Sequence, residues 1–424
     1  MSATKSTVSS PWSFVPFTQC LGDQGSVKRR KILARDYKTV GAIPVIDQGQ
    51  QLIAGWTDDR EAAICEPLPF IVFGDHTRVF KFVDFPFALG ADGTQLLRPN
   101  SGFNPRFFYY ACLNLSLPNR GYNRHFTILK EQELPQPQKP EQEKIAAVLW
   151  KLQLAIDVEE KLVTIARELK QSAMRQLFTR GLRDEPLEET EIGPLPASWK
   201  PQRLEQCCNV VSSSLSYTDF AQMQGSKDGD ALAAMGIKVS DMNLRGNEIR
   251  LIKANLEKQI DCKLAEQKLV PPDTVVFPKR GAAIATNKKR LTTVWTVLDP
   301  NLIGVRAGED MNSAFLFYWF QQFDLRAITE PGPTPQLNKK NLTPLMLPIP
   351  TDPDEQSEIA NTLQKIDEKI SIHEEKRSTF QELFKTLLHE LMTGQIRVDE
   401  LDIDTSEVTG TDNAIDERPI KRRS

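Results

Sequence analysis

Two long segments of the chain, residues 141–179 and 355–393, carry apolar residues at steps of three and four. Steps of this kind place the apolar side chains in one stripe along an α-helix. Neither segment contains proline or glycine, and Gly181 and Gly394 follow them closely, as at helix ends. We therefore predict two helices, each roughly 55–60 Å long at about 1.5 Å per residue.

The two segments are also copies of each other. When the chain is shifted by 214 residues they align without a gap, and 12 of the 39 aligned residues are identical. A weaker echo precedes each copy, because Trp12–Cys20 and Trp199–Cys207 align with a shift of 187. The sequence therefore predicts two internal repeats, each with a variable block followed by a helical block.

An apolar stripe on so long a helix needs a partner, and the other copy is the simplest one. We predict that the helices run antiparallel and form a coiled-coil-like stalk with pseudo-two-fold symmetry. The alternative is that each helix packs on its own domain. The residues predicted for the stalk are Ile145, Leu149, Leu152, Ile156, Leu169, Leu177, Ile359, Leu363, Ile366, Ile370, Phe384 and Leu391.

The variable blocks have the pattern of mixed α/β domains. Short β-rich runs such as Ile43–Ile46 and Thr274–Phe277 are separated by Gly, Pro and Asp, and short helices are predicted around Asn104–Asn114 and Met311–Phe323. The predicted fold class is therefore α/β (mixed α+β), with two globular domains separated by the two long helices. The predicted boundaries are 1–136 and 182–349 for the domains, 137–181 and 350–396 for the helical spacers, and 397–424 for a disordered tail.

Composition narrows the classes of function. The formal net charge is −3 and the pI about 6.0, so the chain as a whole lacks the positive charge typical of DNA-binding proteins. No run approaches the length of a membrane span, and Met1–Pro11 lacks the apolar core of a secretion signal. Six cysteines without a CxxC and four scattered histidines predict reduced thiols, no zinc site and a cytoplasmic location.

Catalytic motifs are sparse. Asn104-Pro105-Arg106-Phe107 resembles the Asn-Pro-Pro-Phe/Tyr motif of amino-methyltransferases, but no glycine-rich loop for S-adenosylmethionine accompanies it. A turn that starts a helix is the simpler interpretation. A P-loop and a GxSxG elbow are also absent from the sequence. We predict that the chain has no catalytic residue, no metal site and no cofactor of its own.

Local clusters nevertheless suit nucleic acid. Lys28–Lys31 is a dense cationic run, and residues 279–290 hold five positive charges without an acid. Polar loops precede the long helices at Arg120–His125 and Gly332–Lys340. Arg, Asn and Gln can bind base edges and Lys can bind phosphates, whereas a solvated surface turn is the alternative for any one run. The candidate DNA-binding residues are Lys28, Arg29, Arg30, Arg78, Arg124, His125, Lys279, Arg280, Asn287, Lys288, Lys289, Arg290, Gln336, Asn338 and Lys339.

The order of several segments resembles the specificity subunit of type I restriction–modification enzymes. Pro67–Pro99 is similar to part of one class of target-recognition domain in that family. Gln176–Gly181 is similar to the end of its first conserved helix and Glu189–Trp199 to the opening of its second domain. Phe277–Arg290 and Pro335–Asn338 are similar to the body of that second domain, so the resemblance covers nearly the whole chain in order.

The resemblance implies a non-catalytic DNA reader. Its target-recognition domains, residues 1–136 and 182–349, would bind the two halves of a bipartite, asymmetric site in double-stranded DNA, and the helices would fix the gap near one DNA turn. Two adenine-N6 methyltransferase subunits would dock on the helices and bring the motor-nuclease subunits. These partners would use the S-adenosylmethionine, ATP and Mg²⁺. A stand-alone or fused DNA methyltransferase or restriction enzyme, and a purely structural coiled-coil scaffold, are the alternatives.

Overall fold

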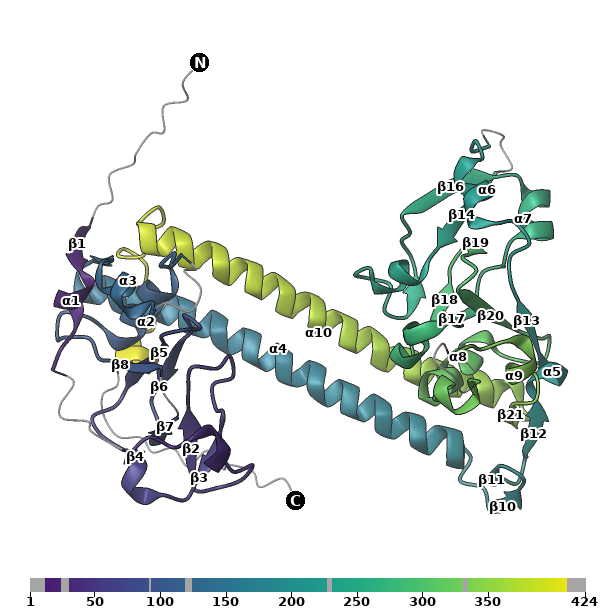
Figure 1. Ribbon diagram of the computed structural model, residues 1–424, viewed down its shortest axis with the longest axis horizontal. Helices are drawn as coiled ribbons and strands as arrows, with labels where there is room; N and C mark the ends of the chain where they lie inside the picture. The colour runs from purple at the N-terminus through teal and green to yellow at the C-terminus, as the bar shows by residue number, and fades with distance from the viewer. Residues whose placement is uncertain are drawn as a thin grey trace. The chain divides into compact units, whose positions relative to one another are not determined.

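The computed structural model describes residues 12–23, 30–90, 93–118, 124–226, 231–330 and 335–409 (Figure 1). The chain divides into two compact units. Unit 1 comprises residues 1–161 and 374–424, and unit 2 comprises residues 162–373. None of the helices in the described part of the chain combines the length and the apolar composition that a membrane span requires.

Two helices are far longer than the rest, α4 (Lys139–Arg180) and α10 (Pro353–Thr393) (Figure 1). In unit 1, the start of α4 shares a hydrophobic core with the end of α10, through Leu149 and Leu391 among others. In unit 2, the end of α4 shares a core with the start of α10, through Leu177 and Leu363. The helices therefore pack antiparallel, which confirms the predicted mixed α/β fold with two long antiparallel helices. The alternative, in which each helix packs only on its own domain, is wrong.

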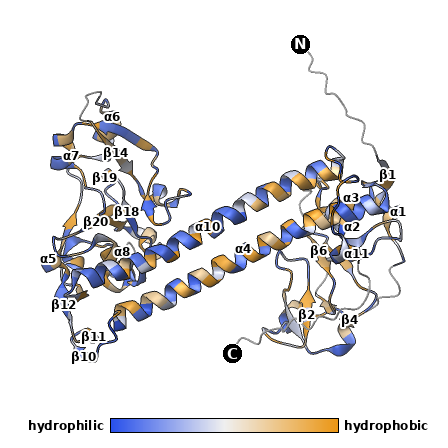
Figure 2. Cartoon of the chain, turned by 180° about the vertical axis from the view of Figure 1, so that it is seen from behind, coloured by the Kyte–Doolittle hydropathy of each residue, from blue (hydrophilic) through white to orange (hydrophobic). Residues whose placement is uncertain are grey.

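The buried stripe of α4 advances by seven residues, the step of a coiled coil. Leu149, Ile156, Val163, Lys170 and Leu177 follow one another at this step, and each is buried or half-buried. Figure 2 shows the resulting alternation of hydrophobic and hydrophilic residues along both long helices. Among the other predicted stalk residues, Ile145, Ile359, Leu363 and Leu391 are buried, and Leu152, Ile366, Ile370 and Phe384 are half-buried.

The prediction that Leu169 lies in the stalk interface is wrong. Leu169 is 56% exposed, and Leu162 and Ile165 on the same face are 36% and 60% exposed. In this part of α4, the apolar residues at steps of three and four do not face the other long helix. Two charged residues, Glu159 and Lys170, occupy the positions on the buried stripe instead. Because Glu159 and Lys170 are charged, the apolar pattern of the sequence does not include them.

Unit 1 is built from short strands and helices around three small sheets. Their orders are β1-β9, β3-β2-β7-β4 and β6-β5-β8. The elements are β1 (Ser13–Pro16), α1 (Phe17–Cys20), η1 (Ala34–Asp36), β2 (Ile43–Ile46), β3 (Gly55–Thr57), η2 (Arg60–Ala62), β4 (Ala63–Ile64), β5 (Phe70–Gly74), β6 (Phe80–Val83), β7 (Phe87–Leu89), β8 (Thr94–Leu97), α2 (Pro105–Leu113), α3 (Phe126–Lys130) and β9 (Glu133–Gln136).

Unit 2 follows a similar plan with one added hairpin, β10-β11. Its other sheets have the orders β12-β21, β16-β14-β19 and β13-β20-β17-β18-β15. The elements are β10 (Leu187–Thr190), β11 (Gly193–Pro196), β12 (Trp199–Arg203), α5 (Leu204–Cys207), β13 (Cys208–Val211), α6 (Tyr217–Gln222), β14 (Leu232–Ile237), η3 (Val239–Asn243), β15 (Arg250–Leu251), β16 (Leu256–Ile260), α7 (Cys262–Lys268), β17 (Val275–Pro278), η4 (Gly281–Thr286), β18 (Arg290–Thr292), β19 (Trp295–Leu298), β20 (Leu302–Ala307), α8 (Ser313–Gln322), η5 (Leu325–Ile328), α9 (Lys339–Leu342) and β21 (Met346–Pro350).

The two units share one core topology. The sheet β6-β5-β8 of unit 1 corresponds to β18-β17-β20 of unit 2, with antiparallel pairing throughout. The order β3-β2-β7 corresponds to β16-β14-β19, and in each case the pair β2·β7 or β14·β19 is parallel. The pair β1·β9 corresponds to β12·β21. The duplication seen in the helices therefore extends through the blocks whose sequences differ.

A tryptophan and a glutamate from the repeats fasten each block to a long helix. In unit 1, Trp12 Nε1 donates to Glu141 Oε2 over 3.2 Å. In unit 2, Trp199 Nε1 donates to Glu355 Oε2 over 3.1 Å. Both glutamates are buried at the start of their helices. The echo between Trp12 and Trp199 is therefore explained by a shared anchoring contact.

The glutamine that follows each of these glutamates, Gln142 or Gln356, makes a second anchoring contact. Asn104 N donates to Gln142 Oε1 and Asn312 N donates to Gln356 Oε1, both over 2.8 Å. Asn104 also caps α2, since its Oδ1 accepts from two backbone N–H groups of the first turn. Its Nδ2 donates to Val408 O. Asn104 is thus a buried helix cap, as the simpler interpretation of its motif predicted.

The predicted disordered tail, residues 397–424, needs correction. Val398 and Val408 are buried in the core of unit 1, and α11 (Ser406–Thr409) ends the described part of the chain. The segment is acidic, but it carries apolar residues that the charge count obscured. Residues 410–424 lie outside the described residues.

Candidate nucleic-acid interface

Unit 2 brings together two polar runs that lie far apart in the sequence. Arg280 follows β17 and forms an isolated antiparallel bridge with Gln336, which precedes α9. Leu337 N donates to Lys279 O over 2.9 Å, and Gly281 N donates to Pro335 O over 2.8 Å. Arg280 and Gln336 are both exposed. The loop after β17 and the segment before α9 therefore form one surface.

This surface is extended by the start of α9. Asn338 is the N-cap of that helix and Lys339 is exposed. Burial and the neighbouring charge of Arg280 lower the pKa of Lys279. We call the surface the unit 2 edge and define it by Lys279, Arg280, Gln336, Asn338 and Lys339.

The second half of the predicted basic run has a different environment. Lys289 is only 1% exposed, its Nζ donates to Phe323 O over 2.6 Å, and burial lowers its pKa to about 8. Asn287 has φ 51°, donates to the same carbonyl and accepts from Leu325 N. Arg290 Nη2 donates to Met242 O over 3.2 Å.

These contacts change the assignment of that half. An ammonium group that lies inside the protein cannot contact a DNA phosphate in this conformation. We therefore revise Asn287, Lys289 and Arg290 from candidate DNA contacts to supports of the loop that carries Arg280. Lys288 is half-buried and its Nζ donates to Asn243 Oδ1, which also directs it toward the protein.

The corresponding surface of unit 1 is formed by the β5–β6 turn and the segment before α3. His125 is fully buried, its Nδ1 lies 2.8 Å from Asp75 O, and Phe126 N donates to Asp75 Oδ1 over 2.7 Å. Arg78 lies in the same turn with φ 62°, and its Nη1 donates to Leu117 O over 2.8 Å. Arg124 is exposed.

Because β5 and β6 correspond to β17 and β18, this turn is the counterpart of the unit 2 loop. We call Arg78 and Arg124 the unit 1 edge, and we revise His125 from a DNA contact to a support. The structure thus places charged or polar candidates at the same topological position of both units. Residues 119–123 and 331–334, which belong to the polar loops, lie outside the described residues.

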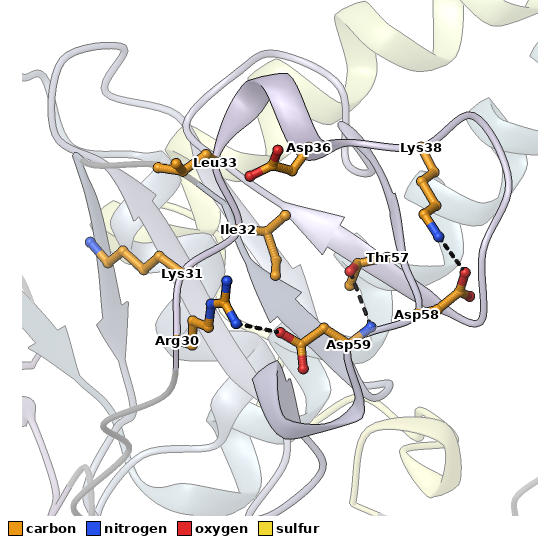
Figure 3. A pocket seen from close by; sticks show the side chains of 9 residues that line it. All are labelled: Arg30, Lys31, Ile32, Leu33, Asp36, Lys38, Thr57, Asp58 and Asp59. Carbon is orange, nitrogen blue, oxygen red and sulfur yellow. Dashed lines mark hydrogen bonds and ion pairs between the residues drawn. The ribbon is translucent and has the colours of Figure 1, made fainter.

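Arg30 belongs to a separate place in unit 1, a pocket of about 490 Å³ (Figure 3). Arg30 Nη1 lies 3.7 Å from Asp59 Oδ2, and Lys38 Nζ lies 2.8 Å from Asp58 Oδ2. The hydrogen bond from Lys38 lowers the pKa of the Asp58 carboxyl group. The pocket is lined by Arg30, Lys31, Ile32, Leu33, Asp36, Lys38, Thr57, Asp58 and Asp59. Its three cations face three carboxylates, so the pocket is not a concentrated positive patch. Lys28 and Arg29 lie outside the described residues.

The described part of the chain holds no group of His, Cys, Asp and Glu that could bind a metal ion. All six cysteines are free thiols, and burial raises the pKa of Cys20 to about 11. A thiol with so high a pKa stays protonated and unreactive at neutral pH.

Comparison with known proteins finds one family and two proteins whose sequences are similar to this chain. Residues 264–380 match the family described as "Type I restriction modification DNA specificity domain". Two Methanocaldococcus jannaschii proteins named as type I restriction enzyme specificity subunits, MjaX and MjaVIII, are each 23% identical to the chain. The MjaX match spans 333 residues, 74% of this chain and 73% of that protein. The MjaVIII match spans 287 residues, 65% of this chain and 64% of that protein, slightly under two thirds of its length.

A solved structure shows the same fold. The crystal structure of a type I restriction-modification system S subunit from M. genitalium aligns with a TM-score of 0.61 at 15% identity. The alignment covers 92% of this chain and 98% of that one. The duplicated plan of strands and long helices is therefore an architecture that a solved protein also has.

Proposed function

We propose that the chain is a DNA specificity subunit of a type I restriction–modification system, a non-catalytic family, and that it reads a bipartite, asymmetric site in double-stranded DNA. Each unit binds one half of the site. Members of this family typically lack a cofactor of their own. S-adenosylmethionine, ATP and Mg²⁺ belong to the partner subunits of the complex.

The observation that carries this proposal is the shared topology of units whose edges differ. Both units present the loop after a core strand together with the segment before a short helix. Unit 1 carries Arg78 and Arg124 there, whereas unit 2 carries Arg280 and Gln336. One architecture with two sets of side chains suits two half-sites of different sequence. The continuous helices α4 and α10 set the gap between the half-sites.

Charge reversal at the unit 2 edge tests DNA binding. The double variant Lys279→Glu, Lys339→Glu is expected to weaken binding by the assembled complex. The slope of log K against log salt should become shallower by about 0.9 for each phosphate that the protein no longer neutralises. The measurement is a salt titration of binding to a duplex that carries the sequence at which the host genome has N6-methyladenine.

The matched control makes the same charge change elsewhere in unit 2. Lys200 and Lys263 are exposed lysines in β12 and α7. We expect Lys200→Glu, Lys263→Glu to leave the salt slope close to that of the wild type. Equal changes of slope in the two double variants would show that the edge has no special role.

The proposal also includes docking of two adenine-N6 methyltransferase subunits, which bring the motor-nuclease subunits. Within unit 2, Leu162, Ile165 and Leu169 expose an apolar stripe on α4. Exposed apolar stripes of this kind suit the apolar face of a partner helix. This stripe lies beside the buried seam of the helix pair, so a partner helix there would extend the packing of α4 and α10.

Glutamate on this stripe separates docking from folding. Ile165→Glu with Leu169→Glu is expected to leave the free energy of unfolding within about 0.5 kcal/mol, because both side chains are already exposed. The same variant should bind the methyltransferase subunit more weakly, since a partner would have to bury the new charges. The measurement is the fraction of complex formed by size exclusion with light scattering. Gln171→Glu, an exposed change on the other side of the same helix, is the control, and equal assembly of both variants would contradict docking on this stripe.

A further inference from the structure

The bridge between Arg280 and Gln336 fixes the relative placement of two side chains. Residues directly opposite each other in an antiparallel pair project their side chains from the same face, with Cβ atoms about 4.5–5.5 Å apart. Gln336 forms a second antiparallel bridge with Glu330 on its other side. Glu330, Gln336 and Arg280 therefore stand in one row across three adjacent segments.

One member of this row is already engaged. Glu330 Oε1 lies 2.7 Å from Lys340 Nζ, and that lysine lowers the pKa of the glutamate. Among the described residues, neither the Arg280 guanidinium nor the Gln336 amide makes a side-chain hydrogen bond or an ion pair. Both side chains are exposed. The row therefore offers two neighbouring groups with open hydrogen-bonding capacity.

The backbone beneath these two residues is held from several sides. Lys279 N donates to Asn301 O over 2.8 Å, and Leu337 N donates back to Lys279 O. The Leu337 side chain is fully buried beside the bridge. Lys289 and Asn287 tie the far end of the loop to Phe323 O. A frame of this kind fixes the backbone that carries the two side chains, so binding has only the side chains themselves to order.

The chemistry of the pair differs from that of a phosphate clamp. Arginine binds the O6 and N7 atoms of guanine through two parallel N–H groups, and glutamine binds N6 and N7 of adenine in the same bidentate way. Glutamine carries no charge, so it adds little to phosphate binding. An Arg beside a Gln at fixed spacing therefore suits two neighbouring base pairs better than it suits the DNA backbone.

We infer that Arg280 and Gln336 form a base-reading pair, which binds the major-groove edges of a guanine and a neighbouring adenine in the half-site of unit 2. The inference rests on the proposed function and deepens it. In unit 1 the buried His125 at the N-cap of α3 corresponds to Asn338 at the N-cap of α9, so the Arg280–Gln336 pair belongs to the half-site of unit 2. The edge lysines, Lys279 and Lys339, contact phosphates on either side.

Two conservative substitutions separate base reading from general DNA binding. Arg280→Lys keeps the positive charge but removes the planar fork, so it can still bind a phosphate but cannot bind guanine in the bidentate way. Gln336→Glu keeps the shape but removes both N–H donors of the amide, so it cannot bind adenine through N6 and N7 together. Lys339→Ala, in the same edge, serves as the matched control for a backbone contact.

The experiment uses the full chain assembled with its methyltransferase subunit. Mapping of N6-methyladenine in the host genome gives the wild-type sequence. Competition binding then compares duplexes altered at one base pair at a time. A wild-type complex that selects no sequence would refute the proposed function itself, before any variant is compared.

With the wild-type sequence in hand, Arg280→Lys is expected to lose discrimination at one base pair of one half-site by roughly 5- to 150-fold. Gln336→Glu should lose it at a neighbouring pair of the same half, and the other half should be read as before. Lys339→Ala should weaken binding to all duplexes by the same factor. The inference is overturned if Arg280→Lys and Gln336→Glu retain the wild-type preference at every position, or if they weaken all duplexes equally as Lys339→Ala does.

Discussion

Replacement of Asp367 by alanine is expected to lower the free energy of unfolding by about 3–5 kcal/mol. Asp367 on α10 is buried in unit 2, with Oδ1 2.6 Å from Lys170 Nζ on α4 and Oδ2 accepting from the Tyr318 hydroxyl over 2.9 Å. The Lys170 side chain is itself only 15% exposed. Without the carboxylate, a charged ammonium and a phenol remain in the core without their partner, which is the costly way to break a buried pair. Denaturant unfolding of the purified chain measures the effect.

Unit 1 supplies the matched rescue for this variant. Under the shift of 214 residues, Lys170 aligns with Phe384 and Asp367 with Gln153. In unit 1 the ring of Phe384 lies 5.9 Å from that of Tyr110, an edge contact without charge. The double variant Lys170→Phe, Asp367→Gln is therefore expected to recover most of the stability that Asp367→Ala loses. The exposed pair Arg203–Glu205, at 4.0 Å, provides the baseline, and Glu205→Ala should cost less than about 1 kcal/mol. A loss for Asp367→Ala as small as that baseline would show that the buried pair contributes nothing special.

The same pair shows why the sequence predicted the helices but not their whole interface. A period of three and four residues over 39 positions is a strong signal for a helix, and the predicted ends of both helices lie within two residues of the observed ones. The interface of α4 follows seven-residue steps, however, and Lys170 occupies one of them. A lysine belongs there only because Asp367 faces it from the other helix. That partner is 197 residues away in sequence, so no local pattern reveals it.

Contacts with residues distant in sequence also decide which candidate DNA-binding residues are exposed and which are buried. Lys279, Arg280 and Lys289 all lie in one basic run, and nothing in the run separates the exposed Arg280 from the buried Lys289. The difference comes from Phe323 O, which accepts the Lys289 ammonium from another element. The pairing of Arg280 with Gln336 also joins positions distant in sequence. Strand pairing uses backbone atoms and tolerates many side chains, which is why the common topology of the two blocks is not visible in their sequences.

The C-terminal segment carries the second large effect. A chain that ends at residue 396 is expected to have about 3 kcal/mol less stability in unit 1 than a chain that ends at residue 409. Val398 and Val408 are buried in the core of unit 1, and burying a valine contributes about 1.5–3 kcal/mol, part of which offsets the entropy of ordering the segment. The shorter chain also lacks the bonds from Arg397 to the buried Glu141 at 2.5 and 3.2 Å. Thermal unfolding of the two chains is the measurement.

Comparison of these two truncations isolates residues 397–409, because both chains lack everything beyond them. Hydrogen exchange gives the location of the effect. Val408 O accepts from Asn104 Nδ2, and Glu407 accepts from Trp150 Nε1, so the shorter chain should exchange faster along α2 and the start of α4. Unit 2 makes its own anchors through Asn312 and Gln356 and should exchange at the same rate in both chains. Equal melting temperatures and equal exchange in unit 1 would mean that the segment merely rests on the surface. The predicted pattern instead makes the segment a part of unit 1 that holds the Asn104 anchor, and with it the strands and short helices of unit 1, on α4.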